Sequence, residues 1–167
     1  MTAQFAETLI YEGKAVSLLS NPLTDYFRLG GHDPGFQSTS TALWRGYIGT
    51  WEIMHDRLYL IALRGTLESG EEACLESVFP GFPERVFAHW FSGKLRIPQG
   101  KQLKYVHMGY GSTYECDVML MLKNGVLIGQ EVHTNGVGPQ DATEGYSIGG
   151  MTVWPARKQG DLSGGHE

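Results

Sequence analysis

Residues 114–133 read YECDVMLMLKNGVLIGQEVH, and they carry the strongest local signal of a fold in this chain. Asn124 and Gly125 separate two runs that are rich in aliphatic residues and methionine. Both central residues of a type I′ turn take positive φ, which Asn and Gly accept at little steric cost. The segment therefore predicts an antiparallel β-hairpin whose alternate side chains lie on opposite faces.

Other segments show the same strand character. Residues 44–63, WRGYIGTWEIMHDRLYLIAL, belong to two long runs that a tight turn at His55 and Asp56 would join. The segment SNPLTD at 20–25 has the composition of a turn. The predicted strands outside residues 114–133 span 5–11, 14–19, 42–54, 57–65, 87–97 and 102–108, with a further turn at 98–101.

One helix is predicted, at residues 69–80, where Ser69 precedes acidic residues and Pro80 ends the run. The 23 glycines suit many turns better than long helices. We therefore predict a mainly β fold: an antiparallel sandwich or partly closed barrel of about eight strands with one short helix. Residues 1–133 would form a single β domain, and residues 134–167 a Gly-rich C-terminal extension that is partly ordered.

Composition narrows the class of protein. A chain of 167 residues fits one domain, and 41% hydrophobic with 19% charged residues is typical of a globular fold. The net charge of −5 counts against binding to nucleic acid. Two isolated cysteines, Cys74 and Cys116, favour a reducing compartment. The chain shows no signal-peptide pattern and no apolar run of the roughly 20 residues that span a bilayer. We expect a cytoplasmic domain.

Motifs of catalysis and metal binding lack their usual context. GYSIG at 145–149 matches the G-x-S-x-G nucleophile elbow, but the flanking residues predict neither the strand nor the helix that the motif requires. Glu131 and His133 would share one face of a strand, and His107 is a third candidate metal ligand. Their spacing is not diagnostic, so we interpret them as surface polar residues. Cys116 reads as a buried small hydrophobe. We expect no metal, no cofactor and no catalytic residue.

The run at 44–63 has charged residues on apolar strand faces. Alternation places Arg45 with Tyr47, Gly49 and Trp51, and Glu52 on the opposite face. Glycines inside a strand mark bends or close approaches, and bends in a curved sheet are the preferred interpretation here. Buried charges require partners, so Arg45 and Glu52 either belong to a structural ion pair or line a cavity and orient a ligand.

The charges of the middle of the chain are segregated. Residues 68–84 contain five acidic and no basic residues, and residues 85–114 contain five basic and no acidic residues. The predicted strand 87–97 would carry Trp90, Lys94 and Arg96 on one face. This face is interpreted either as a basic, aromatic binding surface or as a solvated hairpin that its lysines protect from edge pairing.

Two patterns, WRGYIGTWEI…LYLIAL and FAHWFSGKLRIPQGK…YVHMGYGS, resemble those of an uncharacterised family of small bacterial proteins. The resemblance covers roughly residues 38–133. It implies a bacterial source, and it carries no fold, activity or functional residue.

Two classes of function remain. The first is a protein-binding module, such as an immunity or inhibitor protein that neutralises a basic bacterial toxin. Its contact residues would be Glu71, Glu72, Glu76, Trp90, Lys94, Arg96, Lys104 and Tyr110. The second class is a small-molecule-binding barrel or an enzyme with an aromatic cavity, in which His107 and Glu115 would form an acid–base pair. Its pocket residues would be Arg45, Trp51, Glu52, His107 and Glu115.

Overall fold

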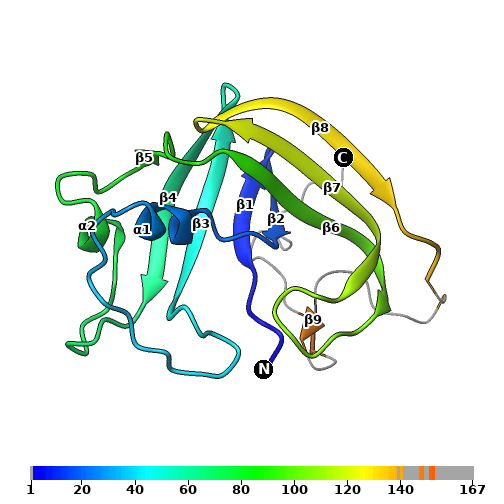
Figure 1. Ribbon diagram of the computed structural model, residues 1–167, viewed down its shortest axis with the longest axis horizontal. Coiled ribbons are helices and arrows are strands. Elements are labelled where there is room, and N and C mark those ends of the chain that lie inside the picture. The colour runs from blue at the N-terminus through cyan, green and yellow to red at the C-terminus, as the bar shows by residue number, and fades with distance from the viewer. Residues whose placement is uncertain (1, 139, 141–146, 149–150, 153–167) are drawn as a thin grey trace, which may run out of the picture.

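The computed structural model describes residues 2–138, 140, 147–148 and 151–152, and it is mainly β, as the sequence predicts (Figure 1). Eight strands form one sheet: β1 Glu7–Tyr11, β2 Lys14–Leu18, β3 Tyr47–Met54, β4 Arg57–Gly65, β5 Val86–Phe87, β6 Gly93–Lys104, β7 Thr113–Lys123 and β8 Val126–Thr134. The helices are α1 Pro22–Arg28 and α2 Leu75–Val78. Two further strands, β9 Ser147–Ile148 and β10 Met151–Thr152, pair with each other.

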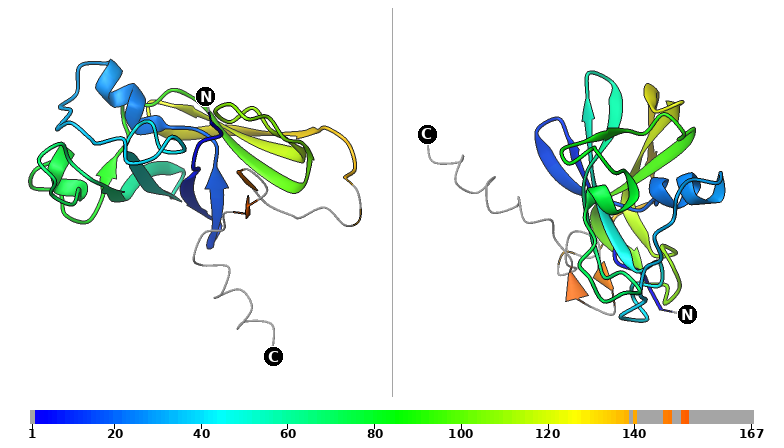
Figure 2. Two further views of the ribbon diagram at one scale, coloured as in Figure 1. Left: turned by 90° about the horizontal axis from the view of Figure 1, so that it is seen from below. Right: turned by 90° about the vertical axis from the view of Figure 1, so that its left-hand side faces the viewer.

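The sheet is strongly curved but is not closed into a barrel. Its strand order is β2-β1-β3-β4-β8-β7-β6, with β5 beside β4, and β1–β3 is its parallel pair. Strands β4 and β8 pair at a single position, Arg57 with Val126, and then diverge. The opposite edges meet where Leu19 N donates to Arg96 O at 2.8 Å. Figure 2 shows this curvature, with both helices at the end of the molecule away from the C-terminal half of β8.

The core lies inside the curve and is built from the alternate residues of the strands. On β3, Tyr47, Gly49 and Trp51 are buried, whereas Ile48 and Thr50 are half-buried on the other face. The largest fully buried side chains are those of Trp51, Tyr47, Tyr114, Leu9, Leu18, Leu23, Leu58, Leu60, Leu95, Ile97 and Leu120. The predicted alternation of β3 is therefore confirmed from Tyr47 onward.

Local turn chemistry determines the hairpins. Asn124 and Gly125 have φ of 50° and 78°, as a type I′ turn requires. His55 and Asp56, with φ of 51° and 61°, join β3 to β4. The predicted hairpins at these turns are confirmed, and the strands predicted at 5–11 and 14–19 pair antiparallel as a further hairpin around Gly13.

The predicted turn at 98–101 is wrong. Strand β6 continues through Pro98 and Gly100 as one strand of 12 residues, and β5 has only two residues, of which Phe87 alone belongs to the predicted strand 87–97. The pairing of β6 with β7 shifts register between Gln99 and Gln102, and Gly100 takes a φ of 82°. Residues 98–101, which suggested a reversal of the chain, therefore lie at a β-bulge within a continuous strand.

The helices also differ from the prediction. Helix α2 has four residues instead of the predicted 69–80, and α1 occupies the segment interpreted as a turn. Pro22 lies at the first helical position of α1, where its missing N–H costs no hydrogen bond, and Leu23 is completely buried. Residues 42–46 of the predicted strand 42–54 precede β3 as loop and turn, and Gly46 has a φ of 81°.

The predicted C-terminal extension, 134–167, lies mostly outside the described residues. Its first part contacts β7, because Asn135 Nδ2 donates to Tyr114 O at 3.0 Å and Gly138 N donates to Glu115 Oε2 at 2.7 Å. In the described part of the chain, no helix has the length and apolar character needed to cross a membrane.

Candidate functional site

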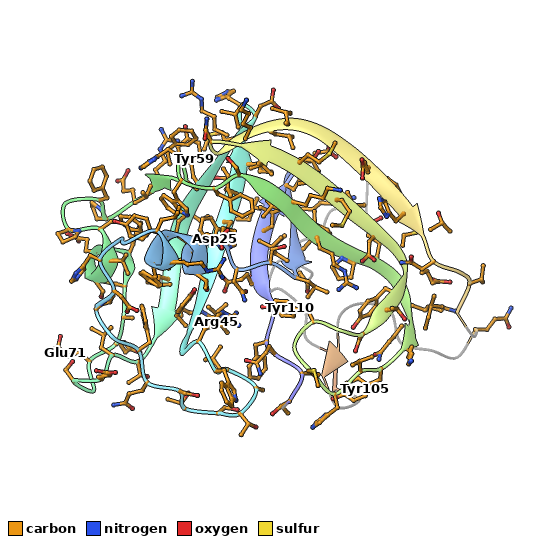
Figure 3. All side chains as sticks on the ribbon, in the orientation of Figure 1. Asp25, Arg45, Tyr59, Glu71, Tyr105 and Tyr110 are labelled. Carbon is orange, nitrogen blue, oxygen red and sulfur yellow. The ribbon has the colours of Figure 1, made fainter. Side chains whose placement is uncertain are left out.

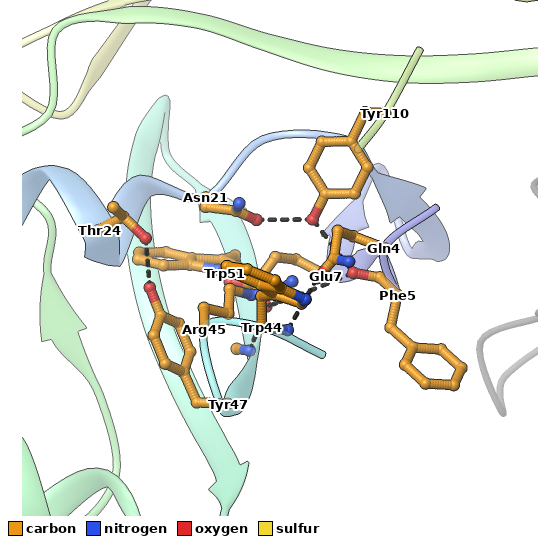
Figure 4. A network of polar contacts seen from close by, with 11 residues as sticks. Gln4, Phe5, Glu7, Asn21, Thr24, Trp44, Arg45, Tyr47, Trp51 and Tyr110 are labelled. Carbon is orange, nitrogen blue, oxygen red and sulfur yellow. Dashed lines mark hydrogen bonds and ion pairs between the residues drawn. The ribbon is translucent and has the colours of Figure 1, made fainter. Parts of the chain in front are cut away.

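A buried carboxylate lies at the centre of a polar network between β1 and β3 (Figure 4). Glu7 is 1% exposed, and its Oε2 lies 2.9 Å from Arg45 Nη2. The same oxygen accepts a hydrogen bond from Gly49 N at 2.6 Å, and Oε1 accepts one from Trp51 Nε1 at 3.3 Å. Burial raises the pKa of Glu7, while Arg45 and the Gly49 N–H partly offset that rise. The carboxylate is thus held in one position by three donors.

Parallel pairing of β1 with β3 brings Glu7 to this place, because Leu9 lies in register with Trp51. A Cβ atom on Gly49 would lie 2.9 Å from Glu7 Oε1 and 2.8 Å from Trp51 Nε1. Such a contact is too short for real side chains, so Gly49 permits the close approach of the carboxylate. The glycine that the sequence suggested as a bend is therefore required by the buried acid, beside a register shift at Thr50/Trp51.

Arg45 is held by one of its three nitrogens. Nη2 donates to Glu7 Oε2 and to Phe5 O, both at 2.9 Å. Nε is buried, and no described residue accepts a hydrogen bond from Nε or from Nη1. The side chain is 10% exposed, and its guanidinium carbon lies 5.5 Å from the centroid of the Tyr47 ring. Arg45 therefore keeps unused donor capacity.

A cavity of about 530 Å³ opens beside Arg45. Helix α1, the loop before β3, the start of β3 and the loop after β4 line it, and its lining residues are Thr24, Phe27, Arg28, Asp33, Gly35, Phe36, Arg45, Tyr47 and Glu68. The rings of Phe27, Phe36 and Tyr47 form one aromatic cluster with centroid separations of 5.0 to 6.1 Å. The cavity thus combines aromatic walls with several charged side chains, and a concave site of this size is a candidate for small-molecule binding.

Two tyrosine hydroxyls connect the network to the segment around α1. Tyr47 Oη and Thr24 Oγ1 are 2.6 Å apart, and the single hydroxyl hydrogen of Tyr110 has two acceptors within reach, Asn21 Oδ1 at 2.7 Å and Phe5 O at 3.1 Å from Oη. Burial raises the pKa of both tyrosines above their ordinary value of 10.0. Both phenols are therefore neutral at physiological pH and act as hydrogen-bonding groups.

The predicted pocket residues are only partly brought together. A structural Arg–Glu pair exists, but its acid is Glu7 and not Glu52, which lies half-buried on the other face of β3 in register with Tyr59. Trp51 is completely buried in the core.

His107 and Glu115 have separate partners. His107 Nδ1 lies 2.7 Å from the hydroxyl of Tyr105, which Figure 3 labels, and both residues are exposed. Both oxygens of Glu115 accept backbone hydrogen bonds, from Gly138 N and Lys101 N, each at 2.7 Å, and these lower its pKa. The geometry thus gives no sign of the predicted acid–base pair.

The predicted basic and aromatic face is not a continuous surface. Trp90 precedes β6, stacks on Phe79 with centroids 5.6 Å apart and donates from Nε1 to Pro22 O at 2.9 Å. Arg96 uses every nitrogen: Nε donates to Asp117, Nη1 to Tyr110 O and Nη2 to Ser112 O, at 2.7 to 2.8 Å. These two residues are structural contacts.

The remaining predicted contact residues are dispersed. Lys94 is exposed and lies 3.5 Å from Glu131, and Lys104 is exposed at the end of β6. Tyr110 belongs to the Arg45 network. Glu71, Glu72 and Glu76 are all exposed, and Figure 3 shows Glu71 at the margin of the molecule, away from Arg45.

Candidate metal ligands are equally dispersed. Glu131 and His133 do lie 3.1 Å apart, but His107 belongs to another loop. Among the described residues, no group of three or more metal-ligating side chains occurs. Cys116 is half-buried and not fully buried as expected.

Glu7 is the central residue that sequence reasoning missed. The available signal was its place in FAETLIY, where Glu7 falls on the same strand face as Leu9. A charge on an apolar strand face needs a buried partner, and Arg45 is that partner.

No protein-family model matches this chain, and neither a curated protein nor a solved structure shows significant similarity to it.

Proposed function

We propose that this protein binds a small molecule in the cavity beside Arg45, and that the guanidinium orients the ligand. The observation that carries the proposal is the incomplete hydrogen bonding of a buried cation in the wall of an aromatic cavity of about 530 Å³. Glu7 and Phe5 O hold the guanidinium through Nη2, so its position is set before a ligand binds. A preorganised donor costs little ordering entropy when it binds.

The test is a thermal-shift screen of the whole chain against small metabolites, followed by titration calorimetry of each hit. Phe36→Trp fills part of the cavity without touching the Glu7–Arg45 pair, so it should abolish or strongly weaken binding. Phe82→Trp is the matched control, because Phe82 is 55% exposed and does not line the cavity. Hits that bind the Phe36→Trp protein as tightly as the parent would place the ligand elsewhere.

A second candidate function is the binding of another protein through the acidic patch Glu71, Glu72 and Glu76. Exposure of all three carboxylates supports it, since an acidic surface steers association with a basic partner such as a toxin. Affinity capture from a bacterial host, with parent bait and a Glu71→Lys/Glu72→Lys bait, is the experiment. A protein retained by the parent bait and lost from the double variant is the expected result, and equal capture by both would exclude the patch.

A further inference from the structure

The cavity beside Arg45 is polarised in a way that restricts its ligand. Its inner wall carries Arg45, whose side chain is 10% exposed, whereas Asp33 and Glu68 are exposed at its rim. Arg28, the other cation of the lining, is paired with Asp25 at 3.3 Å, and its side chain is 73% exposed. The same cavity thus contains one buried positive group, two exposed carboxylates and aromatic walls.

The two rim carboxylates are close to one another around Gly35. Asp33 Oδ1 accepts a hydrogen bond from Gly35 N at 2.9 Å, and a Cβ atom on Gly35 would lie 3.0 Å from the Glu68 carboxyl carbon. Within the described residues, neither carboxylate has a basic partner within ion-pair distance. The rim therefore offers two acceptors to a cationic group of a ligand.

The inner cation favours a single negative charge. Glu7 already compensates much of the Arg45 charge, so a dianionic phosphate would face Asp33 and Glu68 without enough positive charge to balance it. A carboxylate carries one charge, and its planar geometry matches the free donors of a guanidinium. The aromatic walls of Phe27, Phe36 and Tyr47 suit an apolar body between the two charged ends.

We propose that the ligand is a small zwitterion, such as an amino acid with an apolar side chain. Its carboxylate contacts Arg45 and its ammonium group contacts Asp33 and Glu68. This inference rests on the proposed small-molecule function and adds the chemical class of the ligand.

Matched probes test the two charges separately in titration calorimetry. L-Phenylalanine carries both charges, its methyl ester carries only the cation, and its N-acetyl derivative carries only the anion. We expect the zwitterion to bind at least about tenfold more tightly than either derivative, which corresponds to about 1.4 kcal/mol. Equal or tighter binding of a derivative would overturn the inference.

Variants at the rim test the ammonium contact without disturbing the buried pair. The Asp33→Asn/Glu68→Gln variant should weaken L-phenylalanine about tenfold, while the affinity of the N-acetyl derivative stays constant or rises. Glu76→Gln is the control, because Glu76 is an exposed acid on α2 outside the cavity. An unchanged affinity of L-phenylalanine for the rim variant would also overturn the inference.

The two proposals fail differently. If none of the three probes binds but neutral or singly charged metabolites from the screen bind in a manner sensitive to Phe36→Trp, the zwitterion inference is wrong and the small-molecule function stands. If no metabolite of any charge class stabilises the protein, both are wrong.

Discussion

The side chains of Arg45 and Arg96 are only 10% and 21% exposed, and each is paired with an acid. The two guanidinium groups differ in how many of their nitrogens donate hydrogen bonds. Arg96 uses all three nitrogens, to donate to Asp117 and two carbonyls, whereas among the described residues Arg45 donates only from Nη2, to Glu7 and a carbonyl. A saturated guanidinium is a structural clamp, because a ligand would have to displace existing bonds. An unsaturated one beside a cavity has donors left for a ligand. The number of occupied donors therefore separates the two roles better than burial or charge does.

The largest effect is expected from removal of the acid behind Arg45. Glu7→Gln leaves a buried guanidinium without its counter-ion, and the free energy of unfolding should fall by about 3–5 kcal/mol. Urea denaturation of the variant and parent measures this change. Glu131→Gln is the control: it breaks an exposed pair with Lys94 and should leave the urea midpoint unchanged. A parent-like midpoint for Glu7→Gln would mean that Glu7 and Arg45 are not a buried pair.

Removal of the Arg96 clamp should cost less, and it should spare ligand binding. Arg96→Lys keeps the charge but cannot reproduce three bonds in a planar fork, so we expect a loss of about 1.5–3 kcal/mol in unfolding free energy. Denaturation and calorimetry on the same sample separate stability from affinity. Loss of ligand affinity at unchanged stability would mean that Arg96 has a role in ligand binding and not only in the structure.

Tyr110 connects the two regions, because its carbonyl accepts from Arg96 and its hydroxyl donates to Phe5 O beside Arg45. Tyr110→Phe removes hydroxyl bonds and should cost about 1 kcal/mol of unfolding free energy at pH 7. The difference in unfolding free energy between parent and Tyr110→Phe should become smaller at high pH, because ionisation of the tyrosine is linked to unfolding. Because the folded pKa is raised, the unfolded tyrosine ionises first above its ordinary 10.0, so parent stability falls as pH rises through that value.

Urea denaturation between pH 7 and pH 11 checks the Tyr110 prediction. The parent should lose stability above pH 10 by up to about 1.4 kcal/mol per pH unit for each such tyrosine, and the variant should lose less. Tyr105→Phe is the control, since Tyr105 lies on an exposed loop. Parallel pH profiles for parent and Tyr110→Phe would contradict the burial of this hydroxyl.

The smallest effect is expected at Glu115, whose carboxylate accepts hydrogen bonds from two backbone N–H groups and from neither arginine. Its folded pKa is lowered by the Gly138 and Lys101 N–H groups, so the stability that it contributes is present above pH 4.5 and is lost as pH falls. Glu115→Gln should accelerate amide hydrogen exchange at Lys101 and Gly138 without changing ligand affinity. Unaltered exchange at both amides would mean that the carboxylate does not restrain this segment.

The sequence predicted those turns and strands that the preferences of their own residues determine. At Asn124-Gly125 and His55-Asp56 the residues themselves accept positive φ, so the turns and the strands beside them could be located without knowledge of the fold. The prediction was wrong where pairing with a distant segment determines the backbone conformation. Gly100 reads as a turn residue, yet β7 pairs along both sides of it and converts it to a bulge.

The candidate site also contains residues that the sequence could indicate and residues that only tertiary packing brings to it. Arg45 and Trp51 stood out in the sequence because a charge and a large ring share one apolar strand face. Glu7, Thr24 and Phe36 did not, since each joins the site through packing of α1, β1 or a loop against β3. Trp90 was likewise predicted to lie on a binding surface, but its indole Nε1 donates to Pro22 O of α1, a helix that the sequence did not predict.

The sequence by itself determined the class of the fold, the hairpin turns and the inward face of β3, because these depend on backbone preference and on a period of two residues. The tertiary structure decided which acid meets Arg45, which arginine keeps free donors, and where the cavity opens. Glu7 and Arg45 are 38 positions apart and meet only because β1 lies parallel to β3. Hydrogen-bond partners across such separations follow from strand order and register, which local residue preferences do not contain.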